Sequence, residues 1–384
     1  MKLRSLLRRT AAVLLILCLL LPATGCGGRS APDGDAPVVG DLTYESTVPL
    51  SYADQFAIYR YEGGYSLIDM VNSDRMLVVP EGATVPEGLD GDIVVVQQPL
   101  DHIYLAATSA MALFESIDAL DAISFVGSNH WYTDSAAQAL ADGTFVYAGK
   151  YNAPDYELLL GGGCQLAIES TMILHNPEVK EKMVELGIKT VVERSSYENH
   201  PLGRTEWVKV YGALLGREAE AEAAFTAEAD KIAALEGLDP TGKTAAFFYI
   251  SSGGNAVTYK TNGYVPAMIR IAGGEYIFAD LGLEDDSKLS TVNMSMEQFY
   301  DAAREADVLI YNCSIASQLY TLEDLLDLSP VLEDFKAVQS GDVWCTTESM
   351  FQQTDKMGTI IQEMNAIFSG AAGGDALQYL FKLQ

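Results

Sequence analysis

The stretch TEWVKVYGALLGREAEAEAAFTAEADKIAALE, residues 205–236, has a helical pattern and separates two similar halves of the chain. Apolar side chains recur along it at helical spacing, which places them on one face. Glu and Ala, both good helix formers, fill most of the other positions. Gly216 and the acidic residues after it indicate that one helix ends there and another begins near residue 218. The stretch therefore predicts a helical connector, with a rigid rod at residues 218–236, between two lobes.

On both sides of this connector, short apolar runs alternate with helical patterns. The run DIVVV at residues 92–96 is rich in β-branched residues, which is typical of a strand buried on both faces. Strands that alternate with helices at this spacing predict mostly parallel α/β sheets. We therefore expect one α/β lobe at residues 42–204, with a β-rich beginning at 42–96, and a second α/β lobe at residues 243–384.

The N-terminus has the pattern of an export signal. Basic residues precede an apolar run at residues 11–21, and small residues at 23–25 precede Cys26. The apolar run is too short to span a bilayer as a mature helix. Small residues before a Cys resemble a bacterial lipobox, and an ordinary cleavage site with a chance Cys is the alternative. The lipobox predicts a signal peptide at 1–25, a lipid on Cys26, a flexible tether at 26–41 and an extracytoplasmic, membrane-anchored protein.

Charge and cysteine content limit the classes of partner. The formal net charge of −29 would become −33 after cleavage, because the signal contains four basic residues and no acidic ones. This argues against nucleic acid as a partner, and it leaves the lipid as the contact with the membrane. Cys164, Cys313 and Cys345 are too widely spaced for a metal motif. Two roles remain: all three can be buried as free thiols, or two of them can form a disulfide and leave one thiol free.

Several stretches within residues 97–368 resemble the substrate-binding lipoproteins of bacterial ABC importers for ferric siderophores, haem and cobalamin. These stretches are YAGKY (147–151), APDYE (153–157), LAIESTM (166–172), ERSSY (193–197), HPLGRTEW (200–207) and IAGGE (271–275). The resemblance implies two Rossmann-like α/β lobes joined by a long rigid α-helix, with the ligand in a cleft between the lobes. It also implies a monomer without a cofactor of its own, whose ligand can itself carry iron or cobalt.

The same resemblance implies that one surface carboxylate on each lobe docks on arginines of the ABC transporter permease. Glu157 and Glu297 occupy equivalent positions, each early in a helical pattern that precedes a strand. A Glu–Arg contact is charge-assisted and steers docking more than it adds affinity. Two ordinary solvated glutamates are the alternative.

Ligand contacts are expected where the parallel strands end, because ligands of α/β lobes bind beyond the carboxyl ends of the strands. Aromatic rings with a few cations suit a large, partly anionic ligand such as an iron chelate, a haem or a corrinoid. The residues selected in this way are Tyr104, His130, Trp131, Tyr132, Lys150, Arg194, Tyr197, Tyr259, Lys260 and Phe351. Trp131, Tyr132 and Arg194 are the strongest candidates, with core packing and a structural ion pair as the alternatives.

Two other classes of protein are alternatives to a binding protein for large chelates. A bare divalent-metal site between the lobes is not expected, because all four histidines lie in the first half. A secreted hydrolase is the alternative function, since Glu169 and Glu348 could face each other as a carboxylate pair. The sequence has no G-x-S-x-G or H-E-x-x-H pattern, and we expect a binding protein, not an enzyme.

Overall fold

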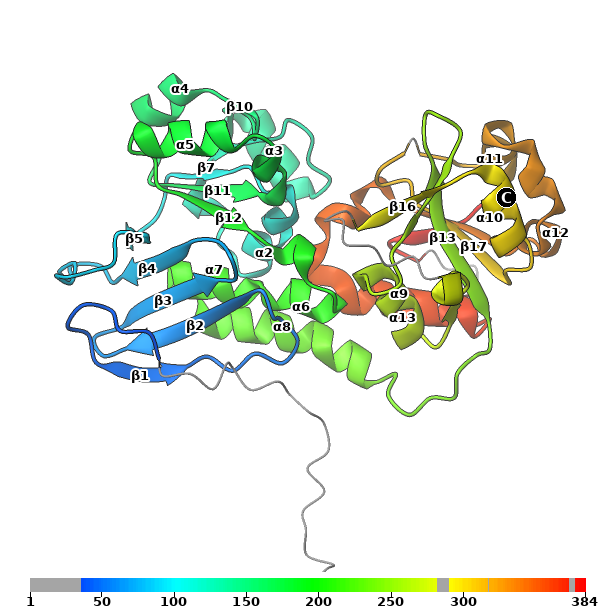
Figure 1. Ribbon diagram of the computed structural model, residues 1–384, viewed down its shortest axis with the longest axis horizontal. Coiled ribbons are helices and arrows are strands. Elements are labelled where there is room, and N and C mark those ends of the chain that lie inside the picture. The colour runs from blue at the N-terminus through cyan, green and yellow to red at the C-terminus, as the bar shows by residue number, and fades with distance from the viewer. Residues whose placement is uncertain (1–35, 282–289, 317, 373–376) are drawn as a thin grey trace, which may run out of the picture.

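The computed structural model of the protein describes residues 36–281, 290–316, 318–372 and 377–384. Figure 1 shows the N-terminal half on the left and the C-terminal half on the right, joined by helices along the lower side of the junction. This arrangement confirms the predicted α/β class with two lobes. The predicted signal peptide, the lipid site Cys26 and most of the tether 26–41 lie outside the described residues.

The β-rich beginning of the first lobe forms a sheet of its own. Its strands lie side by side in chain order and are β1 (Tyr44–Thr47), β2 (Phe56–Tyr61), β3 (Tyr65–Met70), β4 (Arg75–Val79) and β5 (Ile93–Gln97). Neighbouring strands are antiparallel, except for the parallel pair β4 and β5. Alternate side chains point to opposite faces. Phe56 contacts the ring of Trp207 in the connector, with centroids 4.9 Å apart, whereas Tyr59 and Leu77 pack with Val39 in a separate small core.

The prediction that residues 92–96 form a strand buried on both faces is wrong. Among the described strands β5 pairs with β4 alone, so it is an edge strand, and Ile93, Val94 and Val95 are half-buried. The parallel sheet begins instead at the short strand β6 (Ile103–Leu105). A β-branched run suits a partly covered strand as well as a fully buried one, so the sequence pattern alone did not separate the two cases.

Two buried carboxyl groups fasten this first sheet to helix α6 (Pro201–Glu206). Glu206 has no exposed surface and accepts hydrogen bonds of 2.8–3.1 Å from the backbone N–H groups of residues 51–53. Glu198 accepts hydrogen bonds from the N–H groups of residues 54 and 55 and from the indole of Trp207. Burial raises the pKa of Glu198 to about 7. The segment between β1 and β2 is therefore held on the connector by side chains of the connector region itself.

The parallel sheet of the first lobe has the strand order β12-β11-β6-β7-β8. Its other strands are β7 (Ile123–Val126), β8 (Val146–Tyr147), β11 (Leu166–Ser170) and β12 (Thr190–Glu193). One face is covered by α4 (Tyr156–Gly161) and α5 (Pro177–Glu185), whose Leu159 and Met183 pack in one core with Tyr104 and Ala167. The other face packs with α2 (Met111–Ser116) and with the connector. Helix α3 (Asp134–Asp142) links β7 to β8, and a small ladder of β9 (Gly149–Lys150) and β10 (Ala153–Pro154) follows β8.

The connector consists of α6, α7 (Val208–Leu215) and α8 (Glu218–Ala233). Helix α7 ends at Gly216, whose φ of 69° lies in the left-handed region that favours glycine. Helix α8 packs on α7 and on α13 (Met357–Phe368) of the second lobe. Where α8 and α13 cross, a Cβ atom on Gly358 would lie 2.3 Å from the backbone oxygen of Glu228, and the Glu228 carboxyl accepts a hydrogen bond from the N–H of Thr359 at 2.9 Å. The lobes are thus joined by helices in close backbone contact, not by α8 alone.

The sheet of the second lobe has the strand order β16-β14-β13-β17-β18-β19, with β15 also pairing with β13. The strands are β13 (Thr244–Ile250), β14 (Ala256–Tyr259), β15 (Glu275–Tyr276), β16 (Thr291–Met294), β17 (Val308–Tyr311), β18 (Val343–Thr346) and β19 (Leu380–Lys382). The central strands β13, β17 and β18 are parallel. The sheet is accompanied by α9 (Tyr264–Ile271), α10 (Met296–Ala303), α11 (Leu322–Leu328) and α12 (Lys336–Ser340). Its apolar core is continuous with the main core of the first lobe.

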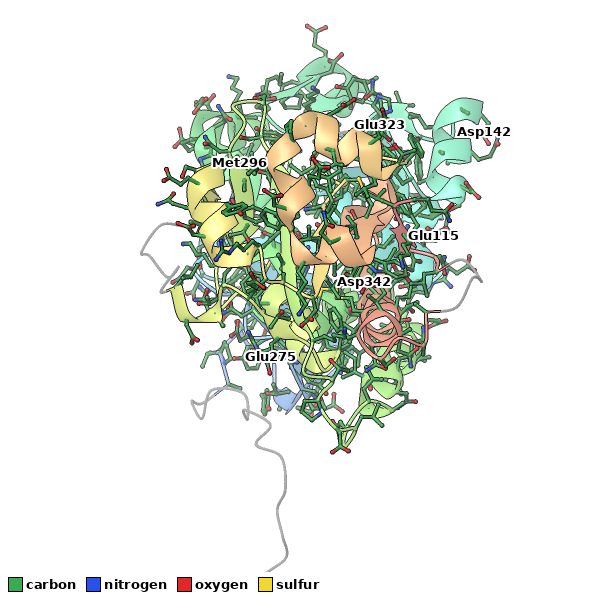
Figure 2. All side chains as sticks on the ribbon, turned by 90° about the vertical axis from the view of Figure 1, so that its right-hand side faces the viewer. Glu115, Asp142, Glu275, Met296, Glu323 and Asp342 are labelled. Atoms are coloured by element: carbon green, nitrogen blue, oxygen red, sulfur yellow. A yellow bond between two sulfur atoms is a disulfide. The ribbon has the colours of Figure 1, made fainter. Side chains whose placement is uncertain are left out.

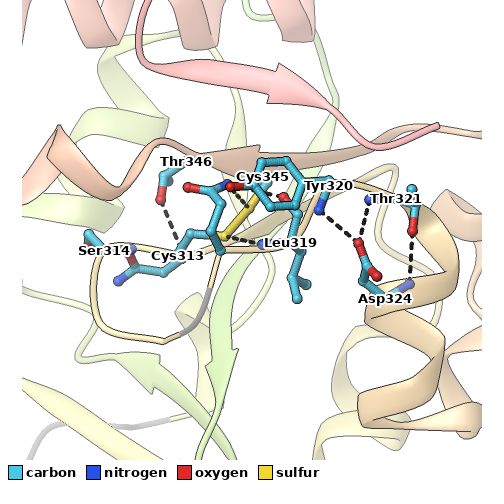
Figure 3. The surroundings of a disulfide bond; sticks show 10 residues. Cys313, Ser314, Leu319, Tyr320, Thr321, Asp324, Cys345 and Thr346 are labelled. Carbon is cyan, nitrogen blue, oxygen red and sulfur yellow. Dashed lines mark hydrogen bonds between the residues drawn. A yellow bond between two sulfur atoms is a disulfide. The ribbon is translucent and has the colours of Figure 1, made fainter.

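A disulfide between Cys313 and Cys345 joins the segment after β17 to β18 (Figure 3). Both cysteines are buried, and their Cα atoms lie 6.5 Å apart. The Sγ atom of Cys313 accepts a hydrogen bond from the N–H of Leu319 at 3.4 Å, and the N–H of Cys313 donates to the hydroxyl of Thr346 at 3.0 Å. Cys164 is a free, half-buried thiol, so of the two possibilities left by the sequence the structure contains the disulfide with a spare thiol.

Candidate functional site

The carboxyl ends of the parallel strands meet at the junction of the two lobes. In the first lobe β6, β7, β11 and β12 run in the same direction, so the segments that follow them share one edge of the sheet. Figure 1 shows β11 pointing toward the second lobe. The short 3₁₀ helix Thr108–Ala110, which follows β6, contacts the 3₁₀ helix Glu348–Gln352, which follows β18 of the second lobe. This is the location at which α/β proteins bind ligands.

An aromatic pair from the two lobes lies at this junction. Tyr132 of the first lobe and Phe351 of the second are 41% and 37% exposed, and their ring centroids are 6.0 Å apart. Gln352 links the same segments, because its Oε1 accepts a hydrogen bond from the N–H of Tyr132 at 3.0 Å and its Nε2 donates to the carbonyl of His130 at 3.3 Å. His130 is exposed, whereas Trp131 is buried. The structure therefore brings these four predicted residues together, and it adds Gln352, which strand-end reasoning missed.

Two arginines lie beside the junction, each on a tyrosine ring. The guanidinium of Arg194, just after β12, lies 4.6 Å from the ring centroid of Tyr197. The guanidinium of Arg204, in α6, lies 4.3 Å from the ring centroid of Tyr264 at the start of α9. Arg204 thus connects the first lobe to the second. Arg204 belongs to the stretch HPLGRTEW that carries the family resemblance, but it lies inside a helix, so the rule that ligands bind at strand ends does not identify it.

Buried polar groups surround these arginines. The Glu193 carboxyl accepts hydrogen bonds from the N–H of Ser195 at 2.8 Å and from the hydroxyl of Ser109 at 3.3 Å. Burial raises the pKa of Glu193, and the charge of Arg204 opposes that increase. On the side of the second lobe, the buried hydroxyl of Tyr259 accepts a hydrogen bond from the amide of Asn312 at 3.2 Å, and burial raises the pKa of Tyr259. Lys260, the next residue, is also buried.

Two of the predicted ligand contacts lie elsewhere. Tyr104 points to the face of the parallel sheet that α4 and α5 cover, and it has no exposed surface. Its hydroxyl donates a hydrogen bond to the carbonyl of Gly149 at 2.9 Å, and burial raises its pKa. Lys150 is exposed in the adjoining strand β9. The structure therefore does not bring Tyr104 and Lys150 to the aromatic pair at the junction.

The two carboxyl groups considered for a hydrolase are not brought together. Glu169 lies on the same face of β11 as Ala167, beside Tyr104 and Tyr156, and is completely buried. Neither carboxyl oxygen has a hydrogen-bond partner among the described residues, and burial raises the pKa of Glu169 to about 8. Glu348 is half-buried in the second lobe, where its charge acts on Tyr132. Glu169 is therefore a carboxyl group within the first lobe and not a member of a pair at the junction.

The two proposed docking glutamates have the same local structure. Glu157 is the second residue of α4, after the N-cap Asp155, and Glu297 is the second residue of α10, after the N-cap Ser295. Both are exposed. Figure 1 places α4 at the top of the first lobe and α10 in the upper part of the second, and Figure 2 labels Met296, which precedes Glu297, at the start of α10. A carboxylate in the first turn of a helix is favoured by the helix dipole and leaves its oxygens available to a partner.

Within the described ranges, no group of three or more His, Cys, Asp or Glu side chains is arranged to hold a metal ion. None of the helices in the part of the chain that the structure covers is long and apolar enough to cross a membrane.

The chain is similar in sequence and in fold to known periplasmic binding proteins. A family model described as periplasmic binding protein matches residues 107–349. An uncharacterized lipoprotein from Methanocaldococcus jannaschii is 26% identical, and the match covers 88% of this chain and 87% of that relative. A periplasmic heme-binding protein from Pseudomonas aeruginosa, 16% identical, covers 74% of this chain and 98% of its own with a TM-score of 0.57. The periplasmic vitamin B12-binding protein of Vibrio cholerae, 17% identical, covers 71% and 98% with a TM-score of 0.51. At these identities the two solved structures show a shared fold.

Proposed function

Since the chain belongs to the periplasmic binding protein family, we propose that it captures a ferric siderophore, a haem or cobalamin between its lobes and delivers this cargo to an ABC transporter permease. The family is the one that the sequence motifs indicated. Binding proteins of this family supply ABC transporter permeases with their ligands, and the function assigned to this chain is accordingly transport.

The observation that carries the proposal is the set of aromatic and cationic side chains that both lobes place at one junction. Tyr132 and Phe351 present exposed ring surface from opposite lobes. Arg194 follows the end of β12, and Arg204 contacts Tyr264 of the second lobe, so two guanidinium groups lie on segments near the place where the lobes meet. A large conjugated ligand can stack on such rings, and its anionic groups can pair with guanidinium groups. Haem and ferric catecholate siderophores have both of these properties.

We propose an extracytoplasmic location, with Cys26 as the lipid attachment site and a monomer as the working form. The relative from Methanocaldococcus jannaschii is named a lipoprotein, which supports the anchor. The lipobox-like residues before Cys26 support it independently. Mass spectrometry of the membrane-extracted protein tests this directly, because the proposal requires an N-terminal Cys26 that carries lipid.

We propose further that Glu157 and Glu297 dock on arginines of the permease. Their equivalent helix positions on the two lobes give a pair of carboxylates with which a permease of two similar halves can pair. An exposed carboxylate that meets a guanidinium forms a bidentate, charge-assisted contact. Since both residues lie on helices outside the junction, reversing their charge should leave cargo binding intact.

The test is the double variant Glu157→Lys/Glu297→Lys, examined for cargo binding by the purified protein and for uptake of radiolabelled cargo by cells. Glu178→Lys/Glu323→Lys is a matched control, because Glu178 and Glu323 are also exposed second residues of helices, in α5 and α11. We expect the first variant to lose uptake with unchanged cargo affinity, and the control to keep both. Normal uptake by the first variant, or equal loss in the control, would contradict this docking geometry.

A further inference from the structure

A glutamine of the second lobe holds the backbone of the first lobe at the junction. Gln352, in the 3₁₀ helix Glu348–Gln352 after β18, is only 2% exposed. Its Oε1 accepts a hydrogen bond from the N–H of Tyr132 at 3.0 Å, and its Nε2 donates to the carbonyl of His130 at 3.3 Å. A carboxamide carries an acceptor and a donor side by side, so one side chain satisfies a backbone N–H and a backbone C=O of the other lobe. These two bonds join the lobes at the place where cargo is expected.

The segment of the first lobe that Gln352 contacts is itself fixed. The hydroxyl of Ser128 accepts a hydrogen bond from the N–H of His130 at 3.1 Å and donates one to the carbonyl of His130 at 3.0 Å. Trp131, between the two residues that Gln352 contacts, is buried in the main core. The carbonyl of His130 and the N–H of Tyr132 are therefore held in place by the first lobe, and the carboxamide of Gln352 meets a preformed pair of groups.

The same contact holds the aromatic pair of the junction closed. The rings of Tyr132 and Phe351 have centroids 6.0 Å apart, and their planes are inclined by 77°. A flat ligand between two parallel rings needs a separation of roughly 7 Å, because each face contact takes about 3.5 Å. Rings that are nearly perpendicular and closer than this cannot stack on both faces of one ligand. Entry of a flat cargo between the rings therefore requires that they separate, and the hydrogen bonds of Gln352 oppose that separation.

The lobes are also joined by the connector, where the contacts are between backbones. The carboxyl of Glu228 in α8 accepts a hydrogen bond from the N–H of Thr359 in α13 at 2.9 Å, beside the close helix crossing at Gly358. The hydroxyl of Thr205 in α6 donates to the carbonyl of Thr354 at 2.9 Å. Helices in backbone contact act as the fixed side of a hinge. A small rotation about this side can break the side-chain contact of Gln352 while the connector stays packed.

We propose that Gln352 is a positioning residue, a latch that keeps the second lobe closed on residues 130–132 in the free protein and opens when a flat cargo enters. The role in cargo entry rests on the proposed function, whereas the closed state of the free protein does not. A cargo bound between the two rings requires an open latch, so the latch lowers the fraction of free molecules that are ready to bind. Its loss should therefore make cargo bind faster and more tightly, which is the opposite of what the loss of a cargo contact does.

The closed state is tested first, without cargo. Spin labels on Glu181→Cys in α5 and Glu323→Cys in α11, one exposed position on each lobe, report the distance between the lobes in a Cys164→Ala background. Hydrogen exchange of the Tyr132 N–H reports the latch itself. Stopped-flow binding of haem and titration with haem then measure association, dissociation and affinity.

Two variants open the latch in different ways. Gln352→Met removes both hydrogen bonds with little change in volume, whereas Gln352→Glu keeps an acceptor for the N–H of Tyr132 and places a carboxylate oxygen beside the carbonyl of His130. Gln339→Glu is the matched control. Gln339, in α12, also donates to a backbone carbonyl, that of Glu333 at 2.6 Å, but this bond lies within the second lobe.

We expect the wild type and Gln339→Glu to show one short distance between the lobes, and both Gln352 variants to add a longer one. Exchange of the Tyr132 N–H should be roughly twofold to tenfold faster in Gln352→Met, which is the effect of one lost hydrogen bond. Haem should associate roughly threefold to thirtyfold faster with Gln352→Met and dissociate at the wild-type rate, so its affinity should rise by the same factor.

Unchanged distances and unchanged exchange in both Gln352 variants, with folding verified by circular dichroism, would overturn the latch and leave the proposed function standing. Slower association of haem with weaker affinity would also overturn it, because that result makes Gln352 a cargo contact. Failure of haem, cobalamin and a ferric catecholate to bind the wild type would overturn the role in cargo entry together with the proposed function, whereas the distances between the lobes still decide the closed state.

Discussion

Removal of the disulfide between Cys313 and Cys345 tests how much this bridge contributes to the stability of the second lobe. The bridge closes a loop with a sequence separation of 32 residues. The chain-entropy relation for a loop of this length gives about 3.7 kcal/mol of stabilisation at 25 °C, because the cross-link restricts the unfolded chain. We therefore expect the double variant Cys313→Ala/Cys345→Ala to lose about 3–4 kcal/mol of unfolding free energy. That is a large part of the stability of a typical protein.

The measurement is urea unfolding at equilibrium, followed by tryptophan fluorescence, since Trp344 adjoins the bridge, whereas Trp131 lies in the first lobe and Trp207 in the connector. Treatment of the wild type with a reductant should lower its stability to near that of the double variant, and the double variant should not respond. Cys164→Ala is the matched control, because this thiol is not bridged, and we expect a change below about 1 kcal/mol. A loss below about 1 kcal/mol in the double variant, or equal sensitivity of both proteins to the reductant, would refute the reasoning.

Three further substitutions examine buried groups outside the junction. Gly358→Ala puts a Cβ atom 2.3 Å from the backbone oxygen of Glu228, so we expect a loss of about 1–3 kcal/mol in thermal unfolding, and wild-type stability would contradict the close helix crossing. Glu206→Ala leaves the N–H groups of residues 51–53 without their acceptor, and should cost about 3–5 kcal/mol and speed hydrogen exchange there; unchanged exchange would argue against this attachment. Burial raises the pKa of Glu169 from 4.5 to about 8. Between these two pH values the folded state keeps a proton on Glu169 that the unfolded state has lost. The unfolding free energy of the wild type therefore falls as pH rises, by up to about 1.4 kcal/mol per pH unit. Glu169→Gln should lack this component in urea unfolding at several pH values, and identical pH dependence in both proteins would be inconsistent with a buried, unpaired carboxyl.

The elements of the second half were predictable because local signals and burial agree. The apolar run at residues 244–250 forms β13, and its central residues are buried on both faces. Helix α10 begins at a capping box formed by Ser295 and Gln298, which is a signal local to the sequence. The first sheet was harder to predict, because the pairing of β5 depends on contacts that a β-branched run does not encode.

The candidate site was predictable where it follows the ends of parallel strands. Tyr132 and Arg194 are found in this way, because the topology brings those ends to one edge. Arg204 and Gln352 come from a helix and a 3₁₀ helix that approach the junction only through tertiary packing. Tyr104 was selected as a residue near a strand end, but the alternation of side chains along β6 turns it to the covered face of the sheet.

Cargo binding by the mature chain tests the central claim most directly. The purified protein is incubated separately with haem, cobalamin and a set of ferric siderophores that includes catecholates, hydroxamates and citrate. Native mass spectrometry and the visible absorption spectrum then record any complex. The proposed function predicts that at least one of these compounds forms a complex of one ligand per chain, with a changed absorption spectrum. If none of them binds, the assignment of this chain to uptake of iron chelates, haem or cobalamin is contradicted.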